Sequence, residues 1–90
     1  MKQARHLTVS GKVQGVGFRY FAQMTAADHG VSGWVKNLDN GTVAVHAEGS
    51  PAELDAFMAD LKKGNHFAKV HHIEEERVPP ESLTSFRIKY

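Results

Sequence analysis

Residues 6–30 read HLTVSGKVQGVGFRYFAQMTAADHG, and the pattern of side chains changes twice along this stretch. At its start, polar and apolar side chains alternate, as they do in a strand that buries one face against a core. We therefore predict a strand over residues 6–13. Its buried face is expected to carry Leu7, Val9 and Val13.

The rest of the stretch predicts a loop that leads directly into a helix. Three glycines, at positions 11, 15 and 17, mark the loop. Phe21, Met24 and Ala27 then recur at helical spacing, so we expect them to form the buried face of the helix. Gly30 can end this helix, because glycine readily adopts the left-handed conformation of a helix cap.

The next two segments predict a hairpin. Residues 31–38 and 42–48 are rich in β-branched side chains and flank a polar stretch, so we expect the turn at Asn40-Gly41. Trp34 is expected to pack on the face of the sheet opposite to Val35. The inner face of the second strand is expected to carry Val43, Val45 and Ala47.

Residues 50–64 predict a second helix with well-defined ends. Ser50 is a typical N-cap, Pro51 suits the first helical position, and Glu53 completes a capping box. Gly64 supplies the stop signal. The apolar stripe of this helix is expected to contain Leu54, Phe57, Met58 and Leu61.

The C-terminal third predicts two more strands. Residues 69–78, KVHHIEEERV, alternate poorly, which is typical of a strand with a bulge or an exposed edge, and the glutamates suit a solvated edge. Pro79-Pro80 predicts a loop, and Phe86, Ile88 and Tyr90 alternate in a final short strand. This element order predicts an α+β, ferredoxin-like βαββαβ sandwich. We expect a mainly antiparallel sheet of four to five strands with two helices on one face.

Composition limits what such a chain can do. Ninety residues suit a single domain over residues 1–90, and the absence of cysteine excludes disulfides and thiolate metal sites. The net charge of +1 gives little long-range attraction to nucleic acid or to a membrane. The N-terminus has no apolar segment typical of a secretion signal. We therefore expect a cytoplasmic protein with no nucleic-acid or membrane partner. A monomer is expected as well, although nothing in the composition bears on the oligomeric state.

The loop at residues 14–19 is the main candidate for chemistry. It lies between a strand end and a helix start, where unpaired amides and the helix dipole attract anions. Gly15 and Gly17 let the backbone approach a ligand closely, and the guanidinium of Arg19 adds a planar set of donors. A plain turn and an exposed arginine are the alternative, although a cation in a first helical turn opposes the dipole.

Two motifs make the chain resemble the acylphosphatase family. They are GKVQGVGFRYF at 11–21 and GWVKNLDNGTV at 33–43, and the resemblance extends over essentially the whole chain. It implies a ferredoxin-like fold that hydrolyses the mixed anhydride of a carboxylate and phosphate. No metal, cofactor or covalent intermediate is implied. The implied partners are a small-molecule acyl phosphate as substrate and inorganic phosphate as product and inhibitor.

The resemblance also assigns roles to individual residues. It implies that Arg19 binds the phosphoryl group, that Asn37 orients the attacking water, and that the hydroxyl of Thr42 supports Asn37. Family members commonly have Asp-Gly where this chain has Asn40-Gly41, and both pairs suit the same turn. The phosphate-binding loop is implied to comprise Gln14, Gly15, Val16, Gly17, Phe18 and Arg19.

Other functions remain as alternatives. A non-catalytic ferredoxin-like module could hold a phosphate or another anion in the same loop, and Asn37 would then bond its own backbone beside the turn. RNA binding would call for aromatic side chains on the central strands, which they lack. A larger acyltransferase-type protein could contain the chain as its N-terminal domain, although Met1 argues against this. A zinc site would have to use His66, His71 and His72, which we expect to be solvated instead.

Overall fold

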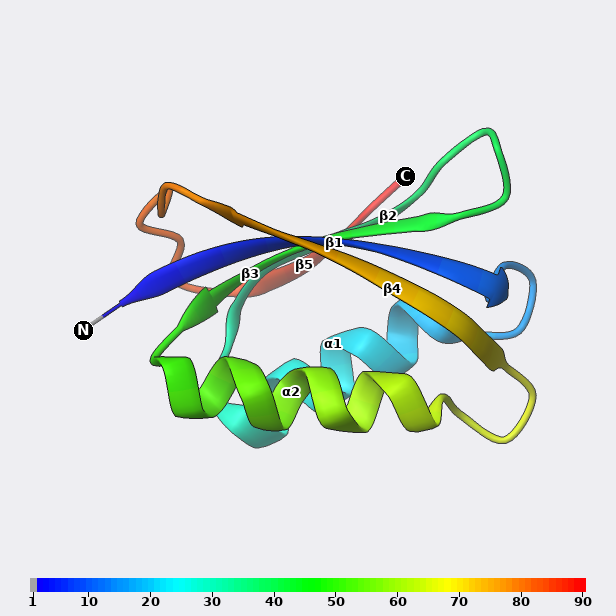
Figure 1. The fold of residues 1–90 in the computed structure, drawn as a ribbon, viewed down its shortest axis with the longest axis horizontal. Coiled ribbons are helices and arrows are strands. Elements are labelled where there is room, and N and C mark those ends of the chain that lie inside the picture. Colours follow the sequence, from blue (N-terminus) through cyan, green and yellow to red (C-terminus); the bar gives the residue numbers. More distant parts are fainter. Residues whose placement is uncertain (1) are drawn as a thin grey trace.

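The computed structural model describes residues 2–90, and its element order confirms the predicted one. Both helices of the described residues lie on the same face of a single sheet, and these residues place no helix on the other face (Figure 1). Neither helix in the described part of the chain is long and apolar enough to span a membrane. The elements are β1 (Gln3–Lys12), α1 (Phe18–His29), β2 (Ser32–Asn37), β3 (Val43–Gly49), α2 (Pro51–Lys63), β4 (Lys69–Val78) and β5 (Phe86–Lys89).

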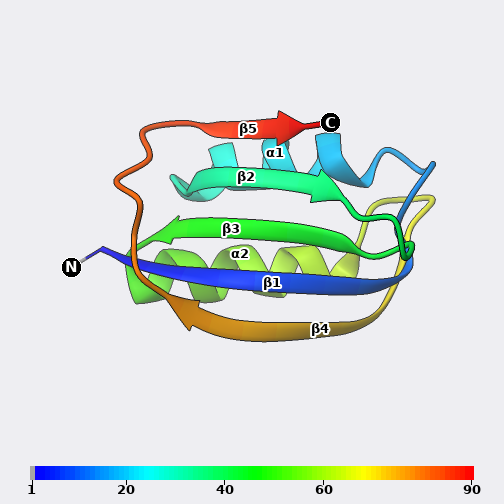
Figure 2. The same cartoon turned by 90° about the horizontal axis from the view of Figure 1, so that it is seen from above.

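The five strands run in the order β4-β1-β3-β2-β5 (Figure 2). All neighbours are antiparallel except β2 and β5, which are parallel. Val43 of β3 pairs with Val9 of β1 on one side and with Asn37 of β2 on the other. Lys36 of β2 pairs with Lys89 of β5. The loop after β1, the end of β2 and the end of β5 therefore meet at one end of the sheet.

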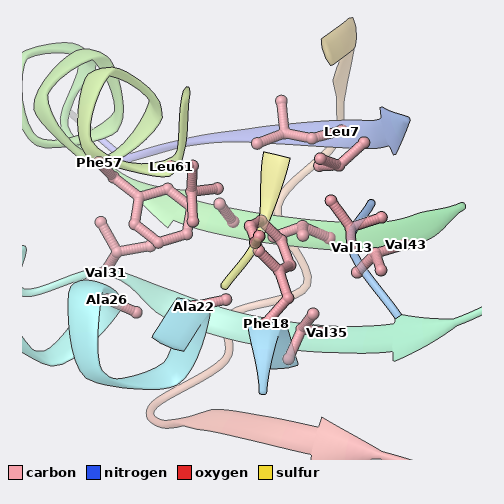
Figure 3. Close-up of a cluster of buried hydrophobic side chains, with 14 of the residues drawn as sticks. Leu7, Val13, Phe18, Ala22, Ala26, Val31, Val35, Val43, Phe57 and Leu61 are labelled. Carbon is pink, nitrogen blue, oxygen red and sulfur yellow. The ribbon is translucent and has the colours of Figure 1, made fainter. Parts of the chain in front are cut away.

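The core fills the space between the helices and the sheet (Figure 3). The predicted inner faces of β1 and β3 are confirmed, because the predicted residues all belong to the buried core. They are Leu7 and Val9 of β1, Val13 just after β1, and Val43, Val45 and Ala47 of β3. Burial of apolar surface contributes about 25 cal/mol per Å², so these side chains supply most of the drive to fold. The core side chains labelled in Figure 3 are Leu7, Val13, Phe18, Ala22, Ala26, Val31, Val35, Val43, Phe57 and Leu61.

Helix α2 matches its prediction at both ends. The Glu53 N–H donates to Ser50 Oγ at 3.2 Å, and the Ser50 N–H donates to Glu53 Oε1 at 2.8 Å, which completes the capping box. Gly64 ends the helix by donating its N–H to Leu61 O. The stripe is confirmed too: Leu54, Phe57 and Leu61 are buried, and Met58 packs against them.

The predicted buried face of α1 is wrong for Met24 and Ala27 and correct for Phe21, which packs against the core. Met24 is 49% exposed, and Ala27 is exposed as well, whereas Phe21 is partly buried. The helix begins at Phe18, whose buried ring fixes the rotation of α1. The small side chains on the same face allow α1 to lie close to the sheet. The buried residues of α1 are Phe18, Ala22, Thr25 and Ala26.

The predicted edge and bulge of β4 are confirmed. β4 lies at the edge of the sheet, and its glutamates are exposed. Its register with β1 shifts where Ser10 pairs with His72 and Gly11 pairs with Val70, so His71 is the extra residue. A Cβ on Gly11 would lie 2.2 Å from Lys69 O, which explains why glycine stands there.

Trp34 lies on the uncovered face of the sheet, as predicted. Its ring stacks on His46 with centroids 5.8 Å apart, and Lys89 Nζ lies 4.6 Å from the ring centre. The hairpin that follows Trp34 turns through residues 39–41. There the Leu38 N–H donates to Thr42 O, and Gly41 has a φ of 89°.

Candidate active site

A pocket of about 140 Å³ opens where the ends of β1, β2 and β5 meet the start of α1. It brings together four of the predicted loop residues and Asn37, which lies on a different strand. Gln14, Val16 and Thr42 do not line it. The lining residues are Val13, Gly15, Gly17, Phe18, Arg19, Tyr20, Asn37, Ile88 and Tyr90.

The first turn of α1 supplies unpaired donors to this pocket. Gly17 is the N-cap residue, with a φ of 74°, and no side chain of the described residues 2–90 caps the helix. The first helical hydrogen bond runs from Phe21 N to Gly17 O, so the amides before Phe21 have no acceptor within the helix. The first turn contains no acidic residue, whereas Arg19 adds a positive charge. This helix end is positively charged and suits an anion.

Asn37 presents a buried acceptor without a donor. Its Oδ1 is the one buried side-chain polar atom in residues 2–90 that has no hydrogen-bond partner. Leaving such an atom unpaired costs about 1–3 kcal/mol, so it calls for an explanation. If Asn37 only stabilised the backbone beside the turn, Oδ1 would be expected to accept a hydrogen bond there. It accepts none. Because Asn37 lines the pocket, this oxygen is available to accept a hydrogen bond from a molecule bound there.

Gln14 connects the loop to the hairpin, a role that sequence analysis missed. Its Nε2 donates to Leu38 O and to Thr42 O, both at 2.8 Å. These two bonds hold the loop against the segment that carries Asn37. The hydroxyl of Thr42 donates to Asn40 Oδ1 at 2.6 Å. Within the described residues, it makes no hydrogen bond to the side chain of Asn37.

Two more contacts around the pocket, and one more lining residue, were not expected from the sequence. The guanidinium carbon of Arg19 lies 4.7 Å from the centre of the Tyr90 ring, which covers the arginine by a cation–π contact. Ile88, on β5, lines the same pocket. Asn65, in the loop after α2, donates from Nδ2 to Val16 O at 2.8 Å. Each of these contacts joins segments far apart in the sequence, so no local pattern signals them.

Glu48 holds the segment that leads into β5. It is fully buried, accepts from Glu81 N and from Leu83 N, and lies 2.7 Å from His46 Nε2 through Oε2. Burial raises its pKa, but the bonds from Glu81, His46 and Leu83 outweigh burial and lower the pKa to about 2. Glu48 therefore acts as a charged anchor for residues 79–85 and, through them, for the β5 wall of the pocket.

The histidines suggested for a metal site lie outside the pocket. His66, His71 and His72 are all exposed. Within residues 2–90, no three side chains of histidine, cysteine, aspartate or glutamate form a group able to hold a metal ion. The residues that line the pocket carry backbone amides, the guanidinium of Arg19, the side-chain amide of Asn37 and the hydroxyls of Tyr20 and Tyr90.

Comparison with known proteins identifies the family. The acylphosphatase family model matches residues 5–88. An acylphosphatase of Clostridium acetobutylicum is 44% identical over 85 residues, which cover 93% of each chain. The crystal structure of acylphosphatase from Bacillus subtilis superposes with a TM-score of 0.94 at 44% identity, covering all of both chains. Full-length HypF matches all of this chain over 12% of its own, at 28% identity and a TM-score of 0.93. This chain belongs to the acylphosphatase family.

Proposed function

We propose that this pocket hydrolyses acyl phosphates, with the loop at residues 14–19 holding the phosphoryl group and Asn37 orienting the water. The observation that carries the proposal is that the pocket combines hydrogen-bond donors and an acceptor that have no partners within the protein. The first turn of α1 offers donors without acceptors, and Asn37 Oδ1 is a buried acceptor without a donor. An acyl phosphate and a water molecule together would satisfy both.

The chemistry needs few groups because a carboxylate is already a good leaving group. Water attacks phosphorus while the bond from phosphorus to the acyl oxygen breaks, and the products are a carboxylate and inorganic phosphate. The loop amides and Arg19 stabilise charge on the equatorial phosphoryl oxygens, and they need no reorientation to do so. Asn37 Oδ1 accepts one proton of the attacking water in a hydrogen bond. An amide is too weak a base to remove that proton, so the phosphoryl group takes it.

The remaining expectations belong to the same proposal. Residues 1–90 act as one acylphosphatase-like domain, which is monomeric and metal-independent and is inhibited by inorganic phosphate. The absence of cysteine suits the reducing conditions of the cytoplasm. The hydroxyl of Thr42 supports Asn37 indirectly, through the hairpin turn that both residues flank.

The test is phosphate release from a simple acyl phosphate by the purified protein and by Arg19→Lys. An ammonium cannot reproduce the two-point grip of a guanidinium on phosphate, so the variant is expected to lose most of its turnover. Near-normal turnover in Arg19→Lys would contradict the proposed grip. Phosphate binding without any turnover in the wild type would favour the non-catalytic module instead.

A further inference from the structure

A hydrogen bond from the loop after α2 holds the loop peptide that precedes α1. Asn65 Nδ2 donates to Val16 O, 49 residues away in the sequence. The Oδ1 of the same side chain accepts from Phe67 N at 3.0 Å and from Ala68 N at 2.7 Å. Because all three backbone partners have a fixed polarity, they determine which way the side-chain amide points.

This bond sets the direction of a donor in the pocket. The described chain contains no cis peptide, so the carbonyl and the N–H of the Val16-Gly17 peptide point in opposite directions. The carbonyl points to Asn65, and neither Val16 nor Asn65 lines the pocket, whereas Gly17 does. The Gly17 N–H is therefore directed away from Asn65, toward the pocket.

Nothing in the loop backbone itself fixes this direction. Turning the peptide over would mainly change ψ of Val16 and φ of Gly17, which is now 74°. Glycine adopts positive and negative φ about equally well, so Gly17 permits either orientation. In the inverted orientation the Val16 carbonyl oxygen would face the pocket and repel an anion. Something outside the loop has to select the productive orientation.

We propose that Asn65 is a positioning residue that locks the Val16-Gly17 peptide with its N–H toward the phosphoryl group. The inference rests on the proposed function, because it assigns the Gly17 amide to the phosphate grip. Asn65 touches no substrate. It acts by holding the carbonyl of Val16 outward.

Two substitutions separate the lock from the local turn that Asn65 also makes. Asn65→Asp keeps an oxygen to accept from the amides of Phe67 and Ala68, but it cannot donate to Val16 O. Asn65→Ser keeps a weaker acceptor for the turn and is too short to reach Val16. His66→Ala, at the exposed neighbouring position, is the matched control. The wild type and all three variants are measured at high ionic strength, which screens the added charge of aspartate.

We expect both Asn65 variants to lose roughly 10- to 100-fold in kcat/KM, less than the ~10²–10³-fold typical of deleting a donor outright. The inhibition constant for inorganic phosphate should rise in both, and Asn65→Asp should be the worse of the two, because its carboxylate also repels the Val16 carbonyl. The melting temperature should fall by less than ~5 °C. In a phosphate titration followed by NMR, the Gly17 amide signal should move strongly in the wild type and in His66→Ala, and weakly in both Asn65 variants.

A purely structural role predicts the opposite order, since aspartate preserves the turn better than serine. The inference would be overturned if the variant with the lower melting temperature also had the lower kcat/KM. It would also be overturned if the phosphate inhibition constant were unchanged in both variants. The Gly17 signal reports binding without turnover. An inactive wild-type protein would therefore refute the proposed function, while the titration would still decide the role of Asn65.

Discussion

Replacing Glu48 by glutamine is expected to lower the free energy of unfolding at neutral pH and to make this free energy depend less on pH in acid. The carboxylate is fully buried, and both of its oxygens are in use: Oε1 accepts from Leu83 N, and Oε2 accepts from Glu81 N and from His46. Glutamine has only one acceptor oxygen, so its NH₂ group must face a donor. The charged anchor of residues 79–85 is lost.

The lowered pKa of Glu48 gives the magnitude. Burial opposes ionisation of Glu48, yet the bonds from Glu81, His46 and Leu83 lower its pKa from 4.5 to about 2. At 1.36 kcal/mol per pH unit, this difference corresponds to about 3 kcal/mol of stability at neutral pH. Because the folded-state pKa is the lower one, the contribution is complete above pH 4.5 and is lost as the pH falls toward 2. About 2 kcal/mol of it should already be gone at pH ~3.

Urea unfolding of the wild type and of Glu48→Gln, at neutral pH and at pH ~3, measures both effects. We expect a loss of about 3 kcal/mol at neutral pH and a much smaller difference between the two proteins in acid. Glu74→Gln removes the same charge from an exposed position on β4 and should change little. The reasoning would be refuted if wild type and Glu48→Gln were equally stable at neutral pH. It would also be refuted if both lost the same free energy of unfolding between neutral pH and pH ~3. Weaker phosphate binding in Glu48→Gln would link this anchor to the β5 wall of the pocket.

Three further predictions concern the pocket. Asn37→Ala should lower kcat by roughly 10²–10³-fold and leave the inhibition constant of phosphate nearly unchanged, as expected when one orienting contact is lost; steady-state kinetics checks this, and an unchanged kcat would remove Asn37 from the mechanism. Gln14→Met keeps the length of the side chain but removes both hydrogen bonds to the hairpin, so kcat should fall while the melting temperature changes less than in Glu48→Gln. If activity fell only as far as the protein unfolded, Gln14 would have no specific role in holding the loop against the hairpin. Chelators should leave turnover unchanged if amides and Arg19 carry the charge, and a loss of activity that added metal restores would contradict this.

Short-range patterns in the sequence predicted most of the fold. The caps of α2 depend on neighbours within four residues, so Ser50, Glu53 and Gly64 could be assigned without tertiary information. Alternation similarly identified the inner faces of β1 and β3. For α1, however, helical spacing alone allowed more than one apolar stripe. The packing of Phe18 and Ala22 against the sheet selected a different face from the one predicted, because a close approach favours small side chains.

The sequence by itself determined the order of the elements, the glycine loop with Arg19 and the motif that contains Asn37. Only the tertiary structure decided how these groups are held. Gln14 reaches carbonyls 24 and 28 residues away, and Glu48 reaches an amide 33 residues away. Asn65 reaches Val16 over 49 residues. Such contacts depend on strand register and on the packing of the helices, which bring segments together that are distant in the sequence. The local spacing of residue types contains no information about which distant segments will meet.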